Sequence, residues 1–162
     1  MLSLRAHYKA SLLLLVLAAT GCSHIGINES NSIFIGRYTE YMWGDIPDQY
    51  ANLSNPLPAS AVNISDGEKL YQMQCLMCHG KTGDGDGPAG KQLVPGPANL
   101  AFTRRLPIAT DAFFFWTISE GGKLFDSAMP AFGEPLSDKE IWQITHYINA
   151  DFNFKEPLIN SE

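Results

Sequence analysis

Apolar residues repeat at helical spacing most clearly near the C-terminal end of the chain. The repeat follows Ser137-Asp138-Lys139-Glu140, a capping-box sequence in which Ser137 is the N-cap and Glu140 stands three residues later. Its apolar positions, three or four residues apart, are Ile141, Ile144, Tyr147 and Ile148. This pattern predicts an amphipathic helix that starts at Ser137.

Two more helices are predicted upstream. Ser65-Asp66-Gly67-Glu68 is a second capping-box sequence, and we expect it to start a helix with Ser65 as N-cap. An apolar run that opens at Thr110 or Asp111 predicts another helix, which ends at Gly121-Gly122. No segment of the sequence shows a convincing strand-like alternation. We therefore expect an all-α domain over residues 65–154, followed by a tail over residues 155–162.

The N-terminus has the pattern of a targeting segment. Arg5 and Lys9 make it basic, and residues 11–19 are almost uninterrupted apolar. This run is about half the length that spans a bilayer, so a transmembrane helix is not expected. It ends in Leu17-Ala18-Ala19-Thr20-Gly21-Cys22, which resembles the lipobox of bacterial lipoproteins. The resemblance implies a signal peptide over residues 1–21 and acylation of Cys22. The alternative is an ordinary secretory signal that leaves this cysteine as a free thiol.

Residues 22–64 are expected to form a lipid-anchored, partly ordered extension and linker. Residues 33–50 carry too many aromatic side chains for a purely solvated tether, so we expect them to pack on the domain or to dock on a partner. Residues 51–63 have the composition of a linker.

The chemistry of the chain centres on Cys75-Leu76-Met77-Cys78-His79, a C-x-x-C-H sequence that occurs once. Two thiols at this spacing can each bond to one vinyl group of a single haem, and the histidine that follows is then held under the iron. We expect Cys75 and Cys78 to be the thioether anchors of one covalent haem c, and His79 to be the proximal iron ligand. A dithiol redox switch would follow a strand in a βαβ pattern, and no such pattern surrounds the motif. A zinc site would need two more ligands at matching spacing, and the remaining cysteine, Cys22, lies far upstream.

A glycine-rich stretch follows the motif over residues 80–90 and predicts a loop. It does not have the signature of a phosphate-binding loop, which needs a lysine-serine pair and a following helix. It also does not have the acidic spacing of a calcium-binding EF-hand. We expect this loop to wrap the edge of the haem.

Residues 65–154 resemble the class I cytochromes c, which are single-haem domains. The resemblance rests on the C-x-x-C-H motif, on Met129-Pro130 before the last helix, and on the capping box at Ser137 with Trp142 and Tyr147 after it. It implies a small cytochrome c-like helical domain wrapped around the haem. In that family the first helix crosses the last at a small residue, and Gly67, facing Tyr147 or Trp142, fits that role.

The family resemblance makes the sulfur of Met129 the second axial ligand of the iron. Met73 and Met77 flank the attachment turn, which ties them to the proximal side of the haem. His146 is the main rival ligand, although its position inside the last helix favours a surface or interhelix role. His24 lies beside the anchor cysteine and is expected to be incidental.

Further contacts around the haem are implied by the same resemblance. The proximal histidine of the family usually donates a hydrogen bond to a proline carbonyl in the following loop, and the candidates are Pro88, Pro95 and Pro97. Arg104 and Arg105 are candidates to pair with the haem propionates, and a solvated loop is the alternative for both.

The charge of the chain limits its partners. Its formal charge of −6 becomes −8 once residues 1–21 are removed, because they hold Arg5 and Lys9 and no acidic residue. Such a charge is unfavourable for nucleic acid and is compatible with a positively charged protein partner.

An iron held by both imidazole and thioether has no open position, so we expect an electron carrier and not an enzyme. The chain is expected to be anchored to a bacterial membrane, to face the periplasm, and to pass single electrons in a respiratory or related chain. It would do so as a subunit of, or a carrier to, a membrane oxidoreductase complex. The alternative is a haem enzyme or a gas-binding sensor with a labile or open sixth position.

Overall fold

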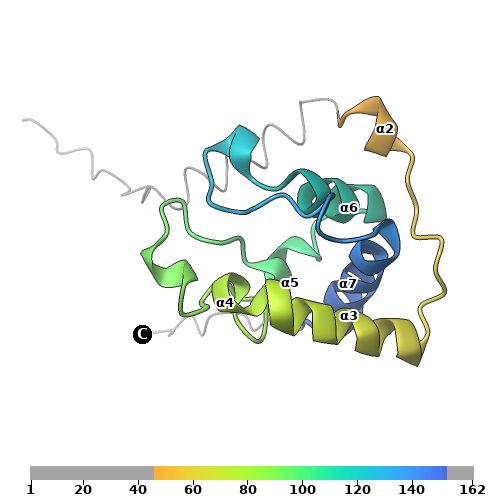
Figure 1. Cartoon of the computed structure of the whole chain (residues 1–162), viewed down its shortest axis with the longest axis horizontal. Coiled ribbons are helices and arrows are strands. Elements are labelled where there is room, and N and C mark those ends of the chain that lie inside the picture. Colours follow the sequence, from red (N-terminus) through yellow and green to blue (C-terminus); the bar gives the residue numbers. More distant parts are fainter. Residues whose placement is uncertain (1–45, 153–162) are drawn as a thin grey trace, which may run out of the picture.

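The computed structural model describes residues 46–152, and in this part of the chain every regular element is a helix (Figure 1). The elements are α2 (Asp48–Ala51), α3 (Ala61–Gln74), α4 (Leu76–His79), the 3₁₀ helix η1 (Gly90–Gln92), α5 (Leu100–Thr103), α6 (Asp111–Glu120), the 3₁₀ helix η2 (Lys123–Phe125) and α7 (Asp138–Asp151). The all-α prediction is confirmed. None of the helices in the described residues has the length and apolar character that a membrane crossing requires. The predicted signal peptide, Cys22, His24 and the C-terminal tail from residue 155 lie outside the described residues.

The helices α3 and α7 cross in close contact, and Gly67 lies at the crossing. A Cβ atom at this position would stand 1.9 Å from the carbonyl oxygen of Gln143 and 3.1 Å from the amide nitrogen of Ile144. Only glycine allows the two backbones to approach this closely. The prediction that Gly67 marks the crossing is confirmed, but its neighbours are the backbone of Gln143 and Ile144 rather than Tyr147 or Trp142.

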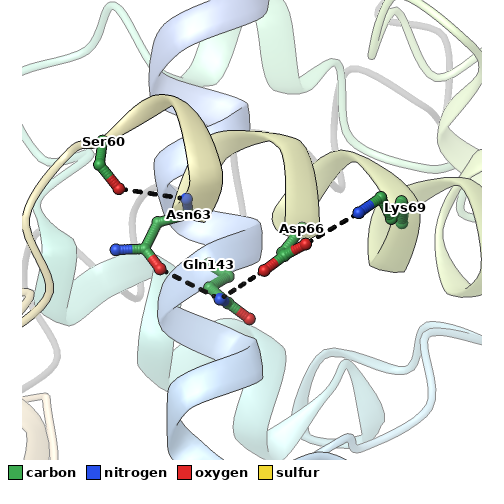
Figure 2. Close-up of polar contacts among 5 residues, drawn as sticks. All are labelled: Ser60, Asn63, Asp66, Lys69 and Gln143. Atoms are coloured by element: carbon green, nitrogen blue, oxygen red, sulfur yellow. Dashed lines mark hydrogen bonds and ion pairs between the residues drawn. The ribbon is translucent and has the colours of Figure 1, made fainter.

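A buried polar side chain fixes the two helices at the same crossing (Figure 2). Gln143 on α7 is only 4% exposed, and its Nε2 donates to Asn63 Oδ1 at 3.1 Å and reaches Asp66 Oδ2 at 3.5 Å, both on α3. Asp66 also pairs with Lys69 one turn later, at 2.9 Å. Since a buried amide is costly to leave without partners, these contacts favour one register of α3 on α7.

The start of α3 differs from the prediction. The helix begins at Ala61, and its N-cap is Ser60, whose hydroxyl accepts a hydrogen bond from Asn63 N at 3.3 Å. Ser65 is exposed in the body of the helix, so the capping box assigned to it is wrong. The physical reason is that residues 61–64 contain no helix breaker, so the helix extends back to the next serine that can cap it, just after Pro58.

The other two helix predictions are confirmed. Thr110 caps α6 through a bond from Phe113 N, and Gly121 ends that helix with a positive φ of 69°. Ser137 and Glu140 form a complete capping box at the start of α7. Local capping chemistry therefore sets both ends of α6 and the start of α7.

Residues 47–60 form a strap that is fixed to the domain. Asn55 makes two of the hydrogen bonds that hold the strap. Its backbone N donates to Asp111 Oδ2 and its Nδ2 donates to the carbonyl oxygen of Trp142, each at 2.9 Å. Farther along, His146 Nε2 lies 2.9 Å from the carbonyl oxygen of Leu57. The prediction of a linker over residues 51–63 is wrong, because asparagine and main-chain groups bind the strap to α6 and α7.

Tyr50 confirms in part that the aromatic segment packs back on the domain. Its ring is buried against Phe115 on α6, with centroids 6.2 Å apart, and its hydroxyl donates to Glu120. Burial and the bond to the Glu120 carboxylate raise the pKa of Tyr50 above its ordinary value. Residues 33–45 of the same segment lie outside the described residues.

Candidate haem site

A pocket lies between α3, α6, α7 and the loops that join them. It contains about 720 Å³ of space that no atom fills, counting the part open to solvent. The lining is mostly aliphatic and aromatic: Tyr71, Cys75, His79, Ala98, Leu100, Thr103, Ile108, Phe113, Phe114, Thr117, Ile118, Met129, Ile144 and Ile148.

The C-x-x-C-H motif is placed at the break between α3 and α4. Cys75 is both the C-cap of α3 and the N-cap of α4, and His79 is the last residue of α4. Both Cys75 and His79 line the pocket, and Cys78 is half-buried beside them. Burial, with the neighbouring Cys78 as a second cause, raises the pKa of the Cys75 thiol to about 12.

The ring of His79 is fixed by a main-chain acceptor. His79 is buried, and its Nδ1 lies 3.0 Å from the carbonyl oxygen of Ala98. A proton on Nδ1 makes Nε2 the lone-pair nitrogen, the one able to bind a metal. The expectation that a proline carbonyl fills this role is wrong for Pro88, Pro95 and Pro97. The acceptor is the residue after Pro97.

Met129 lines the same pocket from the loop between η2 and α7. This loop is pinned to α6 and to the turn that follows it, since the carbonyl oxygen of Met129 accepts from Gly122 N at 2.9 Å and Phe132 N donates to Ile118 O at 3.0 Å. The side chains of Met73 and Met77 are 66% and 53% exposed and do not line the pocket. Of the methionines in the described part of the chain, Met129 is the one whose side chain lines it.

The glycine-rich loop closes over the end of the attachment helix. Gly85 N donates to His79 O at 2.9 Å, Gly87 N to Cys78 O at 3.1 Å and Ala89 N to Met77 O at 2.9 Å. These three carbonyls belong to a four-residue helix and would otherwise lack partners. Gly87 is required here because a Cβ would stand 2.5 Å from Met77 O. The loop thus fixes the backbone that carries the motif.

Residues 62–148 match the protein family described as Cytochrome C oxidase, cbb3-type, subunit III. The chain belongs to this family. It is a class I c-type cytochrome domain and binds haem c covalently.

Similar proteins come from several bacteria. The chain is 26% identical over 110 residues to a thiosulfate dehydrogenase of Stutzerimonas stutzeri, and the match covers 64% of this chain and 32% of that protein. It is 25% identical over 114 residues to a thiosulfate dehydrogenase of Thiomonas intermedia, covering 67% and 32%. The chain therefore spans about a third of the length of the curated relatives it matches.

A similar solved structure belongs to the reducing HAO-like protein complex of Kuenenia stuttgartiensis. It superimposes with a TM-score of 0.51 at 28% sequence identity, and the match covers 60% of this chain and 47% of that chain.

The residues of the cytochrome domain fit a haem. The pocket offers an apolar lining, a thiol from Cys75, an imidazole from His79 and a thioether from Met129. A flat apolar macrocycle with an iron at its centre matches this donor set, because imidazole and thioether sulfur are both haem-iron ligands.

Three other residues singled out in the sequence, Arg104, Arg105 and His146, do not line the pocket. Arg104 donates to the carbonyl oxygens of Phe152 and, at 2.8 Å, of Asn149, so its guanidinium holds the C-terminal end of α7. The guanidinium is therefore not a purely solvated loop charge, because carbonyls at a helix end attract a cation, and its pairing with a haem propionate stays a prediction. Arg105 is exposed in the next position. His146 binds the strap, as expected for an interhelix residue and not for an iron ligand.

Several pocket residues could not be identified from the sequence. Ala98 acts through its main-chain carbonyl, which no side-chain pattern announces. Phe113 and Phe114 lie in a run that is apolar on every side, so periodicity could not tell which of its members face the pocket.

Proposed function

We propose that this chain is an electron-transfer cytochrome whose haem iron is held between His79 and Met129, with Cys75 and Cys78 as the thioether anchors of a single haem. The observation that carries the proposal is that His79, Met129 and Cys75 line one apolar pocket, while the exposed Met73 and Met77 do not. The bound haem supplies one-electron exchange between Fe(III) and Fe(II).

The residues around the site suit a carrier with a closed iron. The Ala98 carbonyl orients the imidazole of His79, and the bond from Gly122 holds the Met129 loop in place. Both ligands are therefore positioned by the fold and need little movement when the charge of the iron changes. The apolar lining keeps water away, which raises the reduction potential because a low-dielectric site disfavours the extra charge of the oxidised state.

The titratable side chains that line the pocket have other roles in this proposal. Among its lining residues the titratable groups are Tyr71, Cys75 and His79. Tyr71 donates its hydroxyl to Gly80 O at 2.7 Å, and burial raises its pKa above the ordinary value. No lining residue in the described part of the chain is a carboxylic acid. This supports electron transfer over a haem enzyme.

The proposal includes a membrane tether and a redox partner. The lipobox resemblance at Cys22 supports acylation and attachment to a bacterial membrane on its periplasmic side. The 25 residues from Cys22 to Ile46 could span at most about 86 Å when fully extended. The solved relative lies in a complex, and the acidic chain carries aromatic side chains in residues 33–50, which supports a role as a subunit of, or a carrier to, a larger redox complex. Thiosulfate oxidation is not part of the proposal, because the chain matches only about a third of those dehydrogenases.

The axial assignment is tested with Met129→Ala in the haem-loaded protein, with Met73→Ala as the matched control at an exposed methionine. We expect Met129→Ala to lower the reduction potential and to let the reduced protein bind carbon monoxide, because a thioether ligand is lost. Met73→Ala should change neither. An unchanged potential in Met129→Ala would remove this residue from the iron.

The tether is tested separately with Cys22→Ser in the natural host. We expect the wild-type protein in the membrane fraction and the variant in the soluble periplasmic fraction. Isolation of the wild-type protein in mild detergent, with identification of the chains that co-purify, then separates a subunit from a free carrier. A variant that stays in the membrane fraction would contradict the lipid anchor.

A further inference from the structure

The carbonyl that accepts from His79 belongs to the peptide between Ala98 and Asn99, and several hydrogen bonds hold Asn99 in place. Its Oδ1 accepts from Phe102 N at 2.7 Å, and its main-chain oxygen accepts from both the amide, at 2.9 Å, and the hydroxyl, at 2.7 Å, of Thr103. These bonds fix the residue on the far side of the peptide from Ala98. The direction of the Ala98 carbonyl is therefore tied to the conformation of Asn99.

A second set of contacts braces Asn99 from the glycine-rich loop. Its Nδ2 donates to Asp84 Oδ1 at 3.4 Å, and the other oxygen of Asp84 accepts from Thr82 at 2.5 Å. The two neighbouring residues are also bonded to each other: Leu100, which follows Asn99, donates its amide to the carbonyl oxygen of Gly83, which precedes Asp84, at 2.6 Å. The segment that carries the Ala98 carbonyl is thus attached to the loop that leaves His79.

Gly85 brings this loop against the same carbonyl. It has a φ of +80°, and a Cβ on it would lie 2.6 Å from Pro97 O and 3.4 Å from Ala98 O. Its amide donates to His79 O. Backbone on both sides of the His79–Ala98 bond is therefore packed too closely to shift freely.

We propose that Asn99, braced by Asp84, is a positioning residue that sets the hydrogen bond on His79 and through it the reduction potential of the haem. This inference rests on the proposed function, in which His79 is an iron ligand. Donation from Nδ1 to a well-placed carbonyl increases the electron density of the imidazole, which stabilises Fe(III) and lowers the potential. If Asn99 is replaced, the carbonyl is less well held, the bond weakens and the potential rises.

The direction of the change separates this role from a merely structural one. Asn99 is also the N-cap of α5, so its loss could loosen the domain and admit water to the pocket. Water at the haem favours the oxidised state and lowers the potential. A weaker bond on His79 raises it.

The test compares Asn99→Ala with Asn52→Ala, the same change at an exposed asparagine, in the haem-loaded protein. We expect the reduction potential of Asn99→Ala to shift upward relative to both the wild type and the control. We also expect hydrogen exchange at His79 Nδ1, followed by NMR in the reduced state, to be faster in Asn99→Ala only. A potential that is unchanged or shifted downward would overturn the proposal, as would unchanged exchange.

Asn99→Ser keeps the test decisive if Asn99→Ala does not fold. A serine can still cap α5, but it lacks the donor to Asp84. We expect the same upward shift, smaller in size, and its absence would overturn the proposal. Failure of the proposed function has a different signature, because a wild-type protein without His79 and Met129 on the iron would bind carbon monoxide when reduced. A negative result at Asn99 in a protein that excludes carbon monoxide removes only the positioning role.

Discussion

Replacing Gly67 with alanine tests how closely the first and last helices of the domain pack. The new Cβ would stand 1.9 Å from the carbonyl oxygen and 2.5 Å from the carbonyl carbon of Gln143. Both are backbone atoms that cannot rotate away, so α3 and α7 must separate to restore ordinary contact distances.

The size of the effect follows from three contributions. Overpacking of this kind costs about 3 kcal/mol, at the upper end of its usual range because the clash is with backbone. Separation of the helices also weakens the bonds of the buried Gln143 amide to Asn63 and Asp66, at a cost of about 1 kcal/mol. Alanine recovers about 1 kcal/mol through its higher helix propensity. The expected loss is about 3 kcal/mol, or roughly 12–24 °C in Tm for a domain of this size.

The assay is thermal and guanidinium unfolding of the haem-loaded protein, followed by far-UV circular dichroism. Ser65→Ala is the matched control, because it introduces alanine at an exposed position of the same helix and should change stability by less than about 0.5 kcal/mol. The reasoning about the crossing would be refuted if Gly67→Ala were as stable as Ser65→Ala.

Three further changes test the caps and the strap by the same unfolding assay. Ser60→Ala should destabilise the domain by about 1 kcal/mol because it removes the cap of α3; a larger loss for Ser65→Ala would restore the sequence-based assignment. Asn55→Ala should cost about 1–2 kcal/mol by removing the amide bond of the strap to α7, and a change no greater than that of Ser65→Ala would mean that the strap adds nothing to stability. The hydroxyl and backbone amide of Ser137 hold the pKa of Glu140 below its usual range, so this carboxylate stabilises the fold above about pH 4.3 and the contribution is lost as the pH falls through the lower folded pKa. The stability difference between the wild type and Glu140→Gln should therefore shrink on acidification from pH 7 to pH 3, and a constant difference would contradict the assignment.

Capping residues made both ends of α6 and the start of α7 predictable, whereas they did not identify the start of α3. Thr110, Gly121 and Ser137 act on their own neighbours in the chain, so their effect is legible in the sequence. In α3 the residues buried against the rest of the domain include Gly67 and Tyr71, and a contact made through glycine leaves no apolar periodicity. Ser60 and Ser65 were both possible N-caps, and the local sequence pattern indicated Ser65, whereas the structure has Ser60.

In the candidate site, too, some groups could be predicted from the sequence and others could not. The C-x-x-C-H motif and Met129 are side-chain signals, and the structure brings Cys75, His79 and Met129 to one pocket. The acceptor for His79 is a main-chain carbonyl whose position depends on how residues 80–100 fold back on α4, so no residue type marks it. The strap was not predicted because Asn55 bonds a carbonyl that is distant in the sequence, and because the composition of the segment is that of a solvated linker.

The central claim is that His79 and Met129 both hold the iron and leave it no open position. The most direct measurement is the absorption spectrum of the reduced wild-type protein at neutral pH before and after carbon monoxide is added. A closed iron predicts no change in the spectrum. Rapid conversion to a carbon monoxide complex would contradict the claim and would favour a haem enzyme or a gas sensor.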